Sequence, residues 1–252
     1  MLFELDQVAY RYSDGTPALD GVTATIESGA QTVILGSNGS GKSTLLRLLN
    51  GLIFPTSGQV RFKGKELSEK SLGQREFRTE FRQSVGFVFQ NADAQLFNAT
   101  VFEELAFGPR QMGLSEAEVT LRVNDVLNFL GMAHLAERPP FRMSGGEKRK
   151  VAIATVLSMN PDVLLFDEPF LGLDPRSQSW LIGTIQQLQA AGKTTIIATH
   201  TLDTIPRVAT KMIVLSEEHT VASISSVEDG LRDTQMLRRA NLLEAEGVLH
   251  GR

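Results

Sequence analysis

The hydrophobic pattern of the second half of the chain alternates short apolar runs with longer amphipathic stretches. Residues 163–166, 195–199 and 212–215 form runs with the length and character of buried strands. Between these runs, residues 145–159 and 176–190 have the length and apolar spacing of helices. Strands that alternate with helices are typical of a parallel sheet whose faces are covered. The pattern therefore predicts an α/β fold.

The first part of the chain has a different pattern, with short strands separated by turns. Strands are predicted over 2–12 and 22–26, with turn residues at 13–17 between them. A buried strand at 33–35 leads directly into a glycine-rich stretch, and leucines at helical spacing then continue to Gly51. This region is expected to contribute both a β subdomain and the first strand of the core.

The middle of the chain, residues 67–140, is predicted to be mainly helical and to be an insert between two αβ halves. Ser115 and Glu118 have the spacing of a capping box, and apolar residues recur at helical spacing from Val119 to Leu130. We expect a single domain over 1–252, with a β subdomain and core formed by 1–66 and 141–222, a helical subdomain at 67–140, and a C-terminal extension at 223–252. The extension has helical fragments in a polar, charge-mixed sequence.

The amino-acid composition and net charge of the chain exclude or disfavour several classes of protein. A chain of 252 residues with 42% hydrophobic and 21% charged residues can bury one core, with or without a smaller subdomain. A net charge of −4 argues against a protein that coats nucleic acid. There is no cysteine, the histidines lie far apart, and no apolar run approaches the roughly 20 residues that cross a bilayer. If the protein acts at a membrane, we expect it to bind there peripherally and not to cross the bilayer.

The stretch GSNGSGKST, from Gly36 to Thr44, is the strongest chemical signal in the sequence. Small residues between a strand and a helix let consecutive backbone N–H groups converge on phosphate oxygens, and the helix start adds partial positive charge. Lys42 is then the cation for the terminal phosphates, and the hydroxyl of Ser43 is a ligand for Mg²⁺. The alternative is a flexible turn that contains a lysine.

A second pair of candidates follows the buried strand at 163–166, which ends in Asp167 and Glu168. Adjacent residues at a strand end point to opposite faces, so one carboxylate can serve the metal and the other the reacting water. We assign Asp167 to Mg²⁺ and Glu168 to the general base. The alternative is that one of the acids caps the next helix.

A third feature is another helix start that contains glycine residues. Ser144 is a natural N-cap, and Gly145 and Gly146 present N–H groups at the positive end of the helix. The residues fit an ordinary cap and a phosphate contact equally well. If both helix starts bind phosphate, each chain lends this helix to the ATP held by its partner, and hydrolysis requires a dimer.

Taken together, these motifs resemble the ATP-binding cassette (ABC) ATPases over most of the chain, from about Tyr12 to His200. Gly36–Ser43 matches the Walker A loop and Asp167-Glu168 the Walker B pair, while Ser144–Glu147 resembles the cassette signature. The signature has Met143 and Glu147 where leucine and glutamine are commoner, and Thr201 follows His200 where aspartate is usual. The resemblance implies a P-loop NTPase fold of ABC type, with a parallel-sheet RecA-like core, an N-terminal antiparallel β subdomain and an inserted α-helical subdomain.

The resemblance also implies roles for single residues. Tyr12, rather than Tyr10, is expected to stack on adenine, and Gln90 is expected to reach Mg²⁺ and the water. Asp174 is expected to lie in the loop that crosses the dimer interface, and His200 is expected to sense the γ-phosphate. The expected catalytic residues are Glu168, His200, Gln90 and Lys42, and the expected Mg²⁺ ligands are Ser43, Gln90 and Asp167. The expected ATP contacts are Tyr12, Gly36, Ser37, Asn38, Gly39, Ser40, Gly41, Lys42, Ser43, Thr44, Ser144, Gly145, Gly146, Glu147 and Asp174.

One segment resembles a particular branch of this family, the energy-coupling factor ATPases that power vitamin or transition-metal uptake. The segment runs from Gln90 to Phe97 and from Thr100 to Pro109, with Ala92 and Ala94 where proline and aspartate are usual. In that branch it receives a helix of the transmembrane partner. Alternatively, its apolar residues are simply core. The sequence 237–243 also resembles cobalt or nickel members.

The resemblance thus implies an ATP-hydrolysing importer subunit at the cytoplasmic face of the cell membrane, peripheral to it. Its expected cofactors are ATP and Mg²⁺. Its expected partners are a second ABC ATPase, in a homodimer or heterodimer, and an integral membrane protein that docks near 90–109, with no nucleic acid. The alternatives are a soluble ABC ATPase of cofactor assembly and the ATPase of another ABC transporter type. A chromosome-maintenance ATPase is disfavoured because no sustained heptad separates Ser43 from Ser144.

Overall fold

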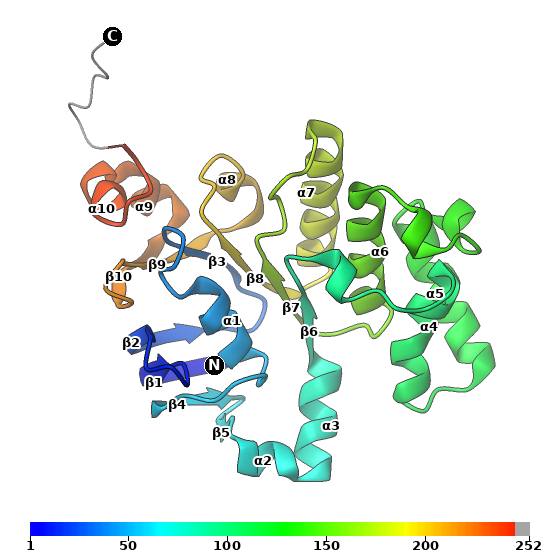
Figure 1. Cartoon of the computed structure of the whole chain (residues 1–252), viewed down its shortest axis with the longest axis horizontal. Helices are drawn as coiled ribbons and strands as arrows, with labels where there is room; N and C mark the ends of the chain where they lie inside the picture. The colour runs from blue at the N-terminus through cyan, green and yellow to red at the C-terminus, as the bar shows by residue number, and fades with distance from the viewer. Residues whose placement is uncertain (245–252) are drawn as a thin grey trace. The chain divides into compact units, whose positions relative to one another are not determined.

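The described part of the protein consists of two units (Figure 1). The structure is a computed structural model that describes residues 1–244. The first unit is formed by Met1–Gly73 together with the chain from Thr194 onward, and the second by Gln74–Lys193. The end of the expected C-terminal extension, 245–252, lies outside the described residues.

An antiparallel sheet opens the first unit. Its strand order is β2-β1-β4-β5, and the strands are β1 (Phe3–Arg11), β2 (Pro17–Ile26), β4 (Ser57–Phe62) and β5 (Lys65–Glu66). The strands predicted at 2–12 and 22–26 are confirmed, whereas β4 and β5 were not anticipated. Phe3 and Phe62 are fully buried, and their ring centroids lie 5.2 Å apart. This aromatic pair anchors β1 to β4 on the inner face of the sheet.

A second set of strands in the first unit has the order β10-β9-β3-β8. The strands are β3 (Gln31–Leu35), β8 (Thr194–Thr199), β9 (Lys211–Leu215) and β10 (Val221–Ser226). β3 is parallel to both β8 and β9, and Leu35 is in register with Thr199 and with Val214. The predicted strands at 33–35, 195–199 and 212–215 are therefore confirmed. Because parallel strands share a carboxyl edge, the loops after β3 and β8 leave the sheet side by side.

Helices cover this set of strands. Helix α1 (Lys42–Leu49) follows β3 directly and buries Leu45, Leu46, Leu48 and Leu49, as the leucine spacing predicted. The C-terminal helices α9 (Val227–Arg232) and α10 (Thr234–Arg239) follow β10. Their residues Val227, Leu231 and Met236 belong to an apolar cluster that also contains Val33 and Leu35 of β3. α8 (Ile205–Val208) joins the same cluster through Ile205.

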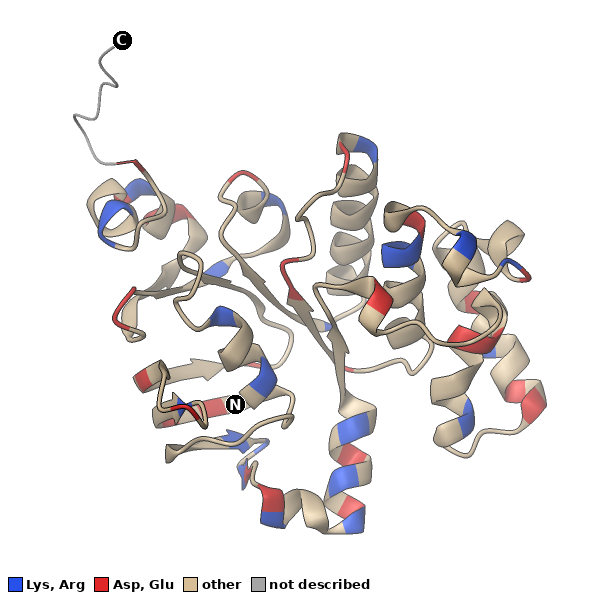
Figure 2. Ribbon diagram, in the orientation of Figure 1, with Lys and Arg blue, Asp and Glu red and all other residues tan. Residues whose placement is uncertain are grey.

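The second unit contains the parallel strands β6 (Val85–Val88) and β7 (Val163–Asp167) and the longer helices that follow β5. The helices are α3 (Arg75–Ser84), α4 (Val101–Gln111), α5 (Glu116–Phe129), α6 (Gly145–Leu157) and α7 (Pro175–Ala190), with α2 (Glu69–Gly73) preceding them in the first unit. Short 3-10 turns lie at Ala92–Ala94, Ala133–Leu135 and Pro140–Arg142. Basic and acidic residues alternate along α3 (Figure 2).

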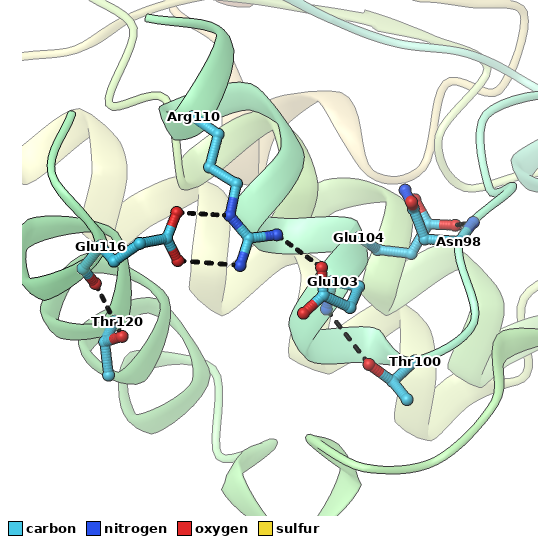
Figure 3. Close-up of polar contacts among 7 residues, drawn as sticks. All are labelled: Asn98, Thr100, Glu103, Glu104, Arg110, Glu116 and Thr120. Carbon is cyan, nitrogen blue, oxygen red and sulfur yellow. Dashed lines mark hydrogen bonds and ion pairs between the residues drawn. The ribbon is translucent and has the colours of Figure 1, made fainter. Parts of the chain in front are cut away.

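Polar contacts fix the helices α4 and α5 (Figure 3). The predicted capping box of α5 is present, with Ser115 and Glu118 bonding each other's backbone N–H groups. Arg110 near the end of α4 donates to Glu116 at 2.9 and 3.0 Å and to Glu103 at 2.5 Å, so one guanidinium ties the two helices together. The hydrogen bonds that Arg110 donates to Glu116, and then to Glu103, raise its pKa.

β6 corrects one expectation, because residues 85–88 lie inside the region predicted to be mainly helical. All four residues of β6 are buried, so the strand has no alternation of apolar and polar positions that could distinguish it from a buried helix end. Its pairing with β7 decides its conformation, with Val85 to Val88 in register with Val163 to Phe166. Similarly, β10 occupies the start of the stretch expected to hold only helical fragments.

None of the helices within residues 1–244 combines the length with the apolar character that a bilayer crossing needs.

The aromatic pair between β1 and β4 gives a stability prediction. We expect Phe62→Ala to lower the free energy of unfolding by about 3–5 kcal/mol, because it removes a fully buried ring and leaves a cavity. Leu52→Ala, at a side chain that is 44% exposed, is the control and should cost less than about 1 kcal/mol. Urea denaturation followed by circular dichroism measures both values. A loss below 1 kcal/mol for Phe62→Ala would show that this pair does not hold the sheet.

Candidate functional site

The glycine-rich loop between β3 and α1 is packed so closely that two of its positions exclude a side chain. Gly41, at the N-terminus of α1, has φ 103°, and a Cβ there would lie 2.1 Å from the carbonyl oxygen of Ala18. At Gly36 a Cβ would lie 2.3 Å from Ser40 Oγ and 2.9 Å from the carbonyl oxygen of Leu215. Both glycines are therefore required by the path of the backbone. This path turns the loop into a cradle that opens onto the start of α1.

The polar groups of this loop fit a polyphosphate. Lys42 is 6% exposed, and its Nζ donates to the carbonyl oxygens of Gly36 and Ser37 at 2.9 Å each, so the ammonium lies across the loop. Within residues 1–244, the hydroxyls of Ser37 and Ser40 are buried side-chain groups for which the structure shows no hydrogen-bond partner. A cation, unpartnered hydroxyls and a helix N-terminus together form a site for an anion with several oxygens.

Tyr12 lies beside this loop. Its hydroxyl is 2.8 Å from Thr44 Oγ1 on the first turn of α1, and its ring meets that of Tyr10 edge to face with centroids 5.2 Å apart. The Tyr12 side chain is partly exposed, while both of these contacts restrict its orientation. The structure thus brings Tyr12 to the predicted phosphate loop, with its side chain 37% exposed.

His200 reaches the same edge of the first unit. It follows the last residue of β8, Thr199, which is in register with Leu35 at the end of β3. The glycine loop begins at the residue after Leu35. His200 and the loop therefore start at the same level on neighbouring parallel strands, as their assignment to one site requires.

In the second unit, β7 ends in the two predicted carboxylates. Asp167 and Glu168 are each 6% exposed, and Glu168 has φ 45°, which is the left-handed region that non-glycine residues rarely adopt. The chain therefore bends directly after the strand, and the N–H of Leu171 donates to the carbonyl oxygen of Glu168 at 3.3 Å. The alternative that one of these acids caps the next helix is wrong, because the N-cap of α7 is Asp174.

Gln90 lies at the same edge of the second unit as Glu168. Val88 is in register with Phe166, so Gln90 and Glu168 each follow the last paired residue by two positions. Arg149 of α6 joins the two loops. Its Nη2 donates to the carbonyl oxygen of Gln90 at 2.7 Å, and its Nη1 to those of Glu168 at 3.2 Å and Pro169 at 2.8 Å. Arg149 was not among the predicted residues, because no spacing rule relates it to backbone carbonyls in distant segments.

The start of α6 is a complete capping box. Ser144 Oγ accepts from the N–H of Glu147 at 3.3 Å, and Glu147 Oε2 accepts from the N–H of Ser144 at 2.9 Å. Glu147 also pairs with Arg138 at 3.0 Å. The N–H and hydroxyl of Ser144, followed by Arg138, lower the pKa of Glu147. A Cβ at Gly145 would meet nothing within 4 Å, whereas one at Gly146 would lie 3.5 Å from Ser177 Oγ, so this helix start is open at Gly145.

Asp174 serves α7 in the same way. It accepts from the N–H groups of Arg176 at 2.9 Å and Ser177 at 3.1 Å, and from the Ser177 hydroxyl at 2.7 Å. The Ser177 hydroxyl, followed by the backbone N–H groups, lowers the pKa of Asp174. The carboxylate is therefore held as a charged cap, which fixes the loop that contains Gly172 and Asp174.

The predicted residues thus form two groups, one in each unit. Tyr12, residues 36–44 and His200 lie at one strand edge of the first unit. Gln90, Asp167 and Glu168 lie together at the end of the β6–β7 pair in the second unit, with the α6 start and Asp174 on neighbouring helices. Of the expected Mg²⁺ ligands, Ser43 belongs to the first group and Gln90 and Asp167 to the second. The first group can bind a polyphosphate, and the second can supply carboxylates for metal and proton chemistry.

Comparison with known proteins decides the family. The model of the ABC transporter family matches residues 19–171, which include the glycine loop, the α6 start and the two carboxylates. This chain belongs to the ABC transporter family. It is an ABC ATPase that binds and hydrolyses ATP, with the fold expected of a P-loop NTPase of this type.

The ABC ATPase has relatives of similar length. The Nickel import ATP-binding protein LarO of Lactiplantibacillus plantarum is 44% identical over 242 residues, covering 96% of this chain and 99% of the relative. The solved structure of cbiO1 from Clostridium perfringens, part of the ABC transporter complex cbiONQ, matches with 38% identity and a TM-score of 0.82 over 96% of this chain and 94% of that chain.

A more distant solved structure, the dimeric post-hydrolysis state of the ATP-binding cassette MJ0796 bound to ADP and Pi, has 27% identity and a TM-score of 0.80 over 90% of this chain and 99% of that chain. Other relatives at 42 to 49% identity have names that state no substrate.

The position of Glu168 beside Asp167 leads to a prediction on turnover. We expect Glu168→Gln to lower the ATPase rate roughly 100- to 10,000-fold while ATP binding stays within about twofold, because the amide keeps the shape of the side chain but cannot take a proton. Rates come from phosphate release, and affinities from titration with a fluorescent ATP analogue.

Glu217→Gln, at an exposed carboxylate outside the site, is the control and should hydrolyse ATP at the wild-type rate. An unchanged rate in Glu168→Gln would remove this residue from the role of base.

Proposed function

We propose that this ABC ATPase powers a membrane importer that takes up a transition-metal ion, nickel or cobalt, or a vitamin, through a transmembrane partner. The observation that carries the proposal is the near full-length likeness to LarO, named for nickel import, and to cbiO1, part of the complex cbiONQ. The groove of the second unit, described below, supports it independently. The protein then acts at the cytoplasmic face of the cell membrane, peripheral to it.

The nucleotide roles follow from the two groups of residues. The loop of residues 36–44 holds the phosphates of ATP through its N–H groups and Lys42, and Tyr12 stacks on the adenine. Ser43, Gln90 and Asp167 would hold Mg²⁺, which would supply Lewis-acid stabilisation of the phosphate oxygens when bound. Glu168 takes the proton of the attacking water, and His200 contacts the γ-phosphate.

A dimer completes the site in this proposal. The start of α6 contains Ser144, Gly145 and Gly146. Its capping box uses Ser144 and Glu147, so the N–H groups of the two glycines remain as hydrogen-bond donors at the helix N-terminus. These donors suit the γ-phosphate of ATP held by a second ABC ATPase, identical or not. The dimeric state of the MJ0796 cassette agrees with such an arrangement. Loss of the γ-phosphate on hydrolysis then removes the contact and the pair reopens.

The segment expected to receive the membrane partner lines a groove of about 630 Å³ in the second unit. Exposed aromatic rings form its apolar surface: Phe97 is 68% and Phe107 44% exposed, with centroids 5.0 Å apart, and Phe89 lies on the same groove. Val101 and Leu105 are fully buried. The alternative that the whole segment is core therefore holds for these two residues and not for Phe97 or Phe107.

One buried carboxylate shapes this groove. Glu104 on α4 is 3% exposed and accepts from the N–H groups of Phe97 and Asn98 and, at 3.1 Å, from Asn98 Nδ2 (Figure 3). Charge-assisted bonds of this kind are strong when they are buried. Glu104 therefore holds the Phe97 backbone in place, and the ring remains outside as an anchor for an apolar helix. Because Gln90 and the groove belong to one segment, movement at the nucleotide passes to the partner through it.

The expected subdomain boundaries belong to the same proposal: a β subdomain and core from 1–66 and 141–222, a helical subdomain at 67–140, and an extension from 223. The groove and the start of α6 both fall at the edges of the helical subdomain. A helical subdomain that turns as a body moves the partner's docking site relative to the core, which holds the start of α6.

The shared-site arrangement generates a prediction on assembly. We expect the Glu168→Gln protein with ATP to dimerise, because nucleotide that is not hydrolysed keeps both helix starts engaged. Adding Ser144→Arg should keep it monomeric, since a long side chain at the open helix start obstructs the approach of a second nucleotide. Analytical ultracentrifugation with ATP and with ADP measures both, and only monomer for Glu168→Gln with ATP would contradict a shared site.

The groove generates a prediction on transport. In cells that express this chain with its integral membrane partner, we expect Phe97→Glu to lower uptake of radioactive Ni²⁺ or Co²⁺ at least about tenfold, because it replaces an exposed ring of the groove with a charge that an apolar partner helix would have to desolvate. The ATPase rate of the isolated chain should stay within about twofold.

Leu121→Glu is the matched control, since Leu121 is 64% exposed on α5 and does not line the groove. It should leave uptake unchanged. Normal uptake with Phe97→Glu would reject the groove as the docking site, and absence of metal uptake in the wild type would reject the metal as cargo.

A further inference from the structure

We propose that Arg149 is a positioning residue for ATP hydrolysis, which holds the Gln90 loop and the Glu168 turn in one fixed arrangement and ties both to the signature helix α6. The inference rests on the proposed roles of Gln90 and Glu168. It adds a residue that touches neither ATP nor water and acts through the backbone of the residues that do.

The hydrogen bonds of Arg149 lie just beyond the point where the pairing of β6 with β7 ends. The last register pair of β6 and β7 is Val88 with Phe166, and Arg149 bonds the carbonyl oxygens two residues beyond each of them, those of Gln90 and Glu168. A third bond, to the carbonyl oxygen of Pro169 at 2.8 Å, fixes the residue after the turn. One side chain therefore continues the connection between two loops that the strands themselves no longer pair.

An arginine suits this place for a geometric reason. Its planar guanidinium presents donors in a fixed fork, so Nη1 serves the Glu168 and Pro169 carbonyls while Nη2 serves Gln90. A lysine carries all its donors on one nitrogen, so it cannot reproduce the separate Nη1 and Nη2 contacts with the two loops. Burial lowers the pKa of the Arg149 guanidinium from an ordinary value far above neutral, so the group stays charged and its bonds are charge-assisted.

The backbone at Glu168 makes this support necessary. With φ 45°, Glu168 lies in a region that costs a non-glycine residue free energy, and such a turn persists only when its surroundings hold it. The turn directs the carbonyl oxygen of Glu168 toward Arg149 and thereby determines where its carboxylate leaves the chain. Removing the arginine frees the turn to relax, and the carboxylate then leaves its working position.

Because Arg149 lies on α6, it also connects the Gln90 and Glu168 loops to the start of that helix. α6 begins at Gly145, directly after Ser144, and Arg149 lies about one turn further along the same rigid helix. A contact at the helix start therefore displaces the Gln90 and Glu168 loops together. In the proposed dimer, the helix start serves one nucleotide while Gln90 and Glu168 serve the other, so Arg149 links the two sites.

The test compares Arg149→Ala and Arg149→Lys with the control Arg232→Ala, which removes a guanidinium that is 72% exposed and paired with Glu228. We expect both Arg149 variants to lower kcat at least tenfold, while the Kd for a fluorescent ATP analogue stays within twofold. Lysine should not restore the rate. Guanidinium ion added at millimolar concentration should raise the rate of Arg149→Ala at least threefold and leave Arg149→Lys and Arg232→Ala unchanged.

A double variant separates this inference from the proposed function. If Arg149 acts through Glu168, then adding Arg149→Ala to Glu168→Gln should change the residual rate less than twofold. Wild-type kcat in Arg149→Ala, full activity in Arg149→Lys, or losses that multiply in the double variant would each overturn the positioning role. A fully active Glu168→Gln would instead reject the proposed base. Thermal denaturation checks folding, and Arg149→Lys keeps the test valid if Arg149→Ala does not fold.

Discussion

The close approach of backbone to backbone around the glycine loop is the constraint on which the nucleotide site depends. A side chain at Gly41 would overlap the carbonyl oxygen of Ala18 in β2, and one at Gly36 would overlap Ser40 within the loop. Only a chain without Cβ atoms at these points can bring consecutive N–H groups to the start of α1. The loop's conformation is thus set by the antiparallel sheet on one side and by β9 on the other. The site is therefore a product of the packing of its unit as much as of its motif.

The sequence predicted the elements whose signal is local. The α5 and α6 helix starts were predicted because their caps lie within four consecutive residues, and β3, β7 and β8 because each is a short apolar run next to a turn or an acid. β6 was missed because four buried residues carry no periodicity, and its conformation comes from β7, more than 70 residues later along the chain. β10 was missed because its alternating serines resemble a polar loop. Such strands exist through their partners, which no local pattern contains.

The same division applies to the site. Residues whose chemistry and spacing form a motif, such as Lys42, Ser43 and the two carboxylates, were found directly. Arg149 and the contact of Tyr12 with Thr44 were not, because each joins a side chain to a segment far away in the sequence. The sequence also leaves open whether the α6 start is a cap or a phosphate contact. The geometry makes these compatible, because the capping box uses Ser144 and Glu147 and leaves the glycines in front.

The left-handed backbone conformation at Glu168 brings the thermal stability of the protein into conflict with its proposed role in ATP turnover. A glutamate in this conformation costs the folded chain about 1–2 kcal/mol, which glycine or asparagine would largely recover. Selection for a more durable protein alone would therefore replace the carboxylate that we propose as the general base. A family of engineered or ancient variants that was screened only for survival on heating would drift toward nucleotide-binding proteins that no longer turn over.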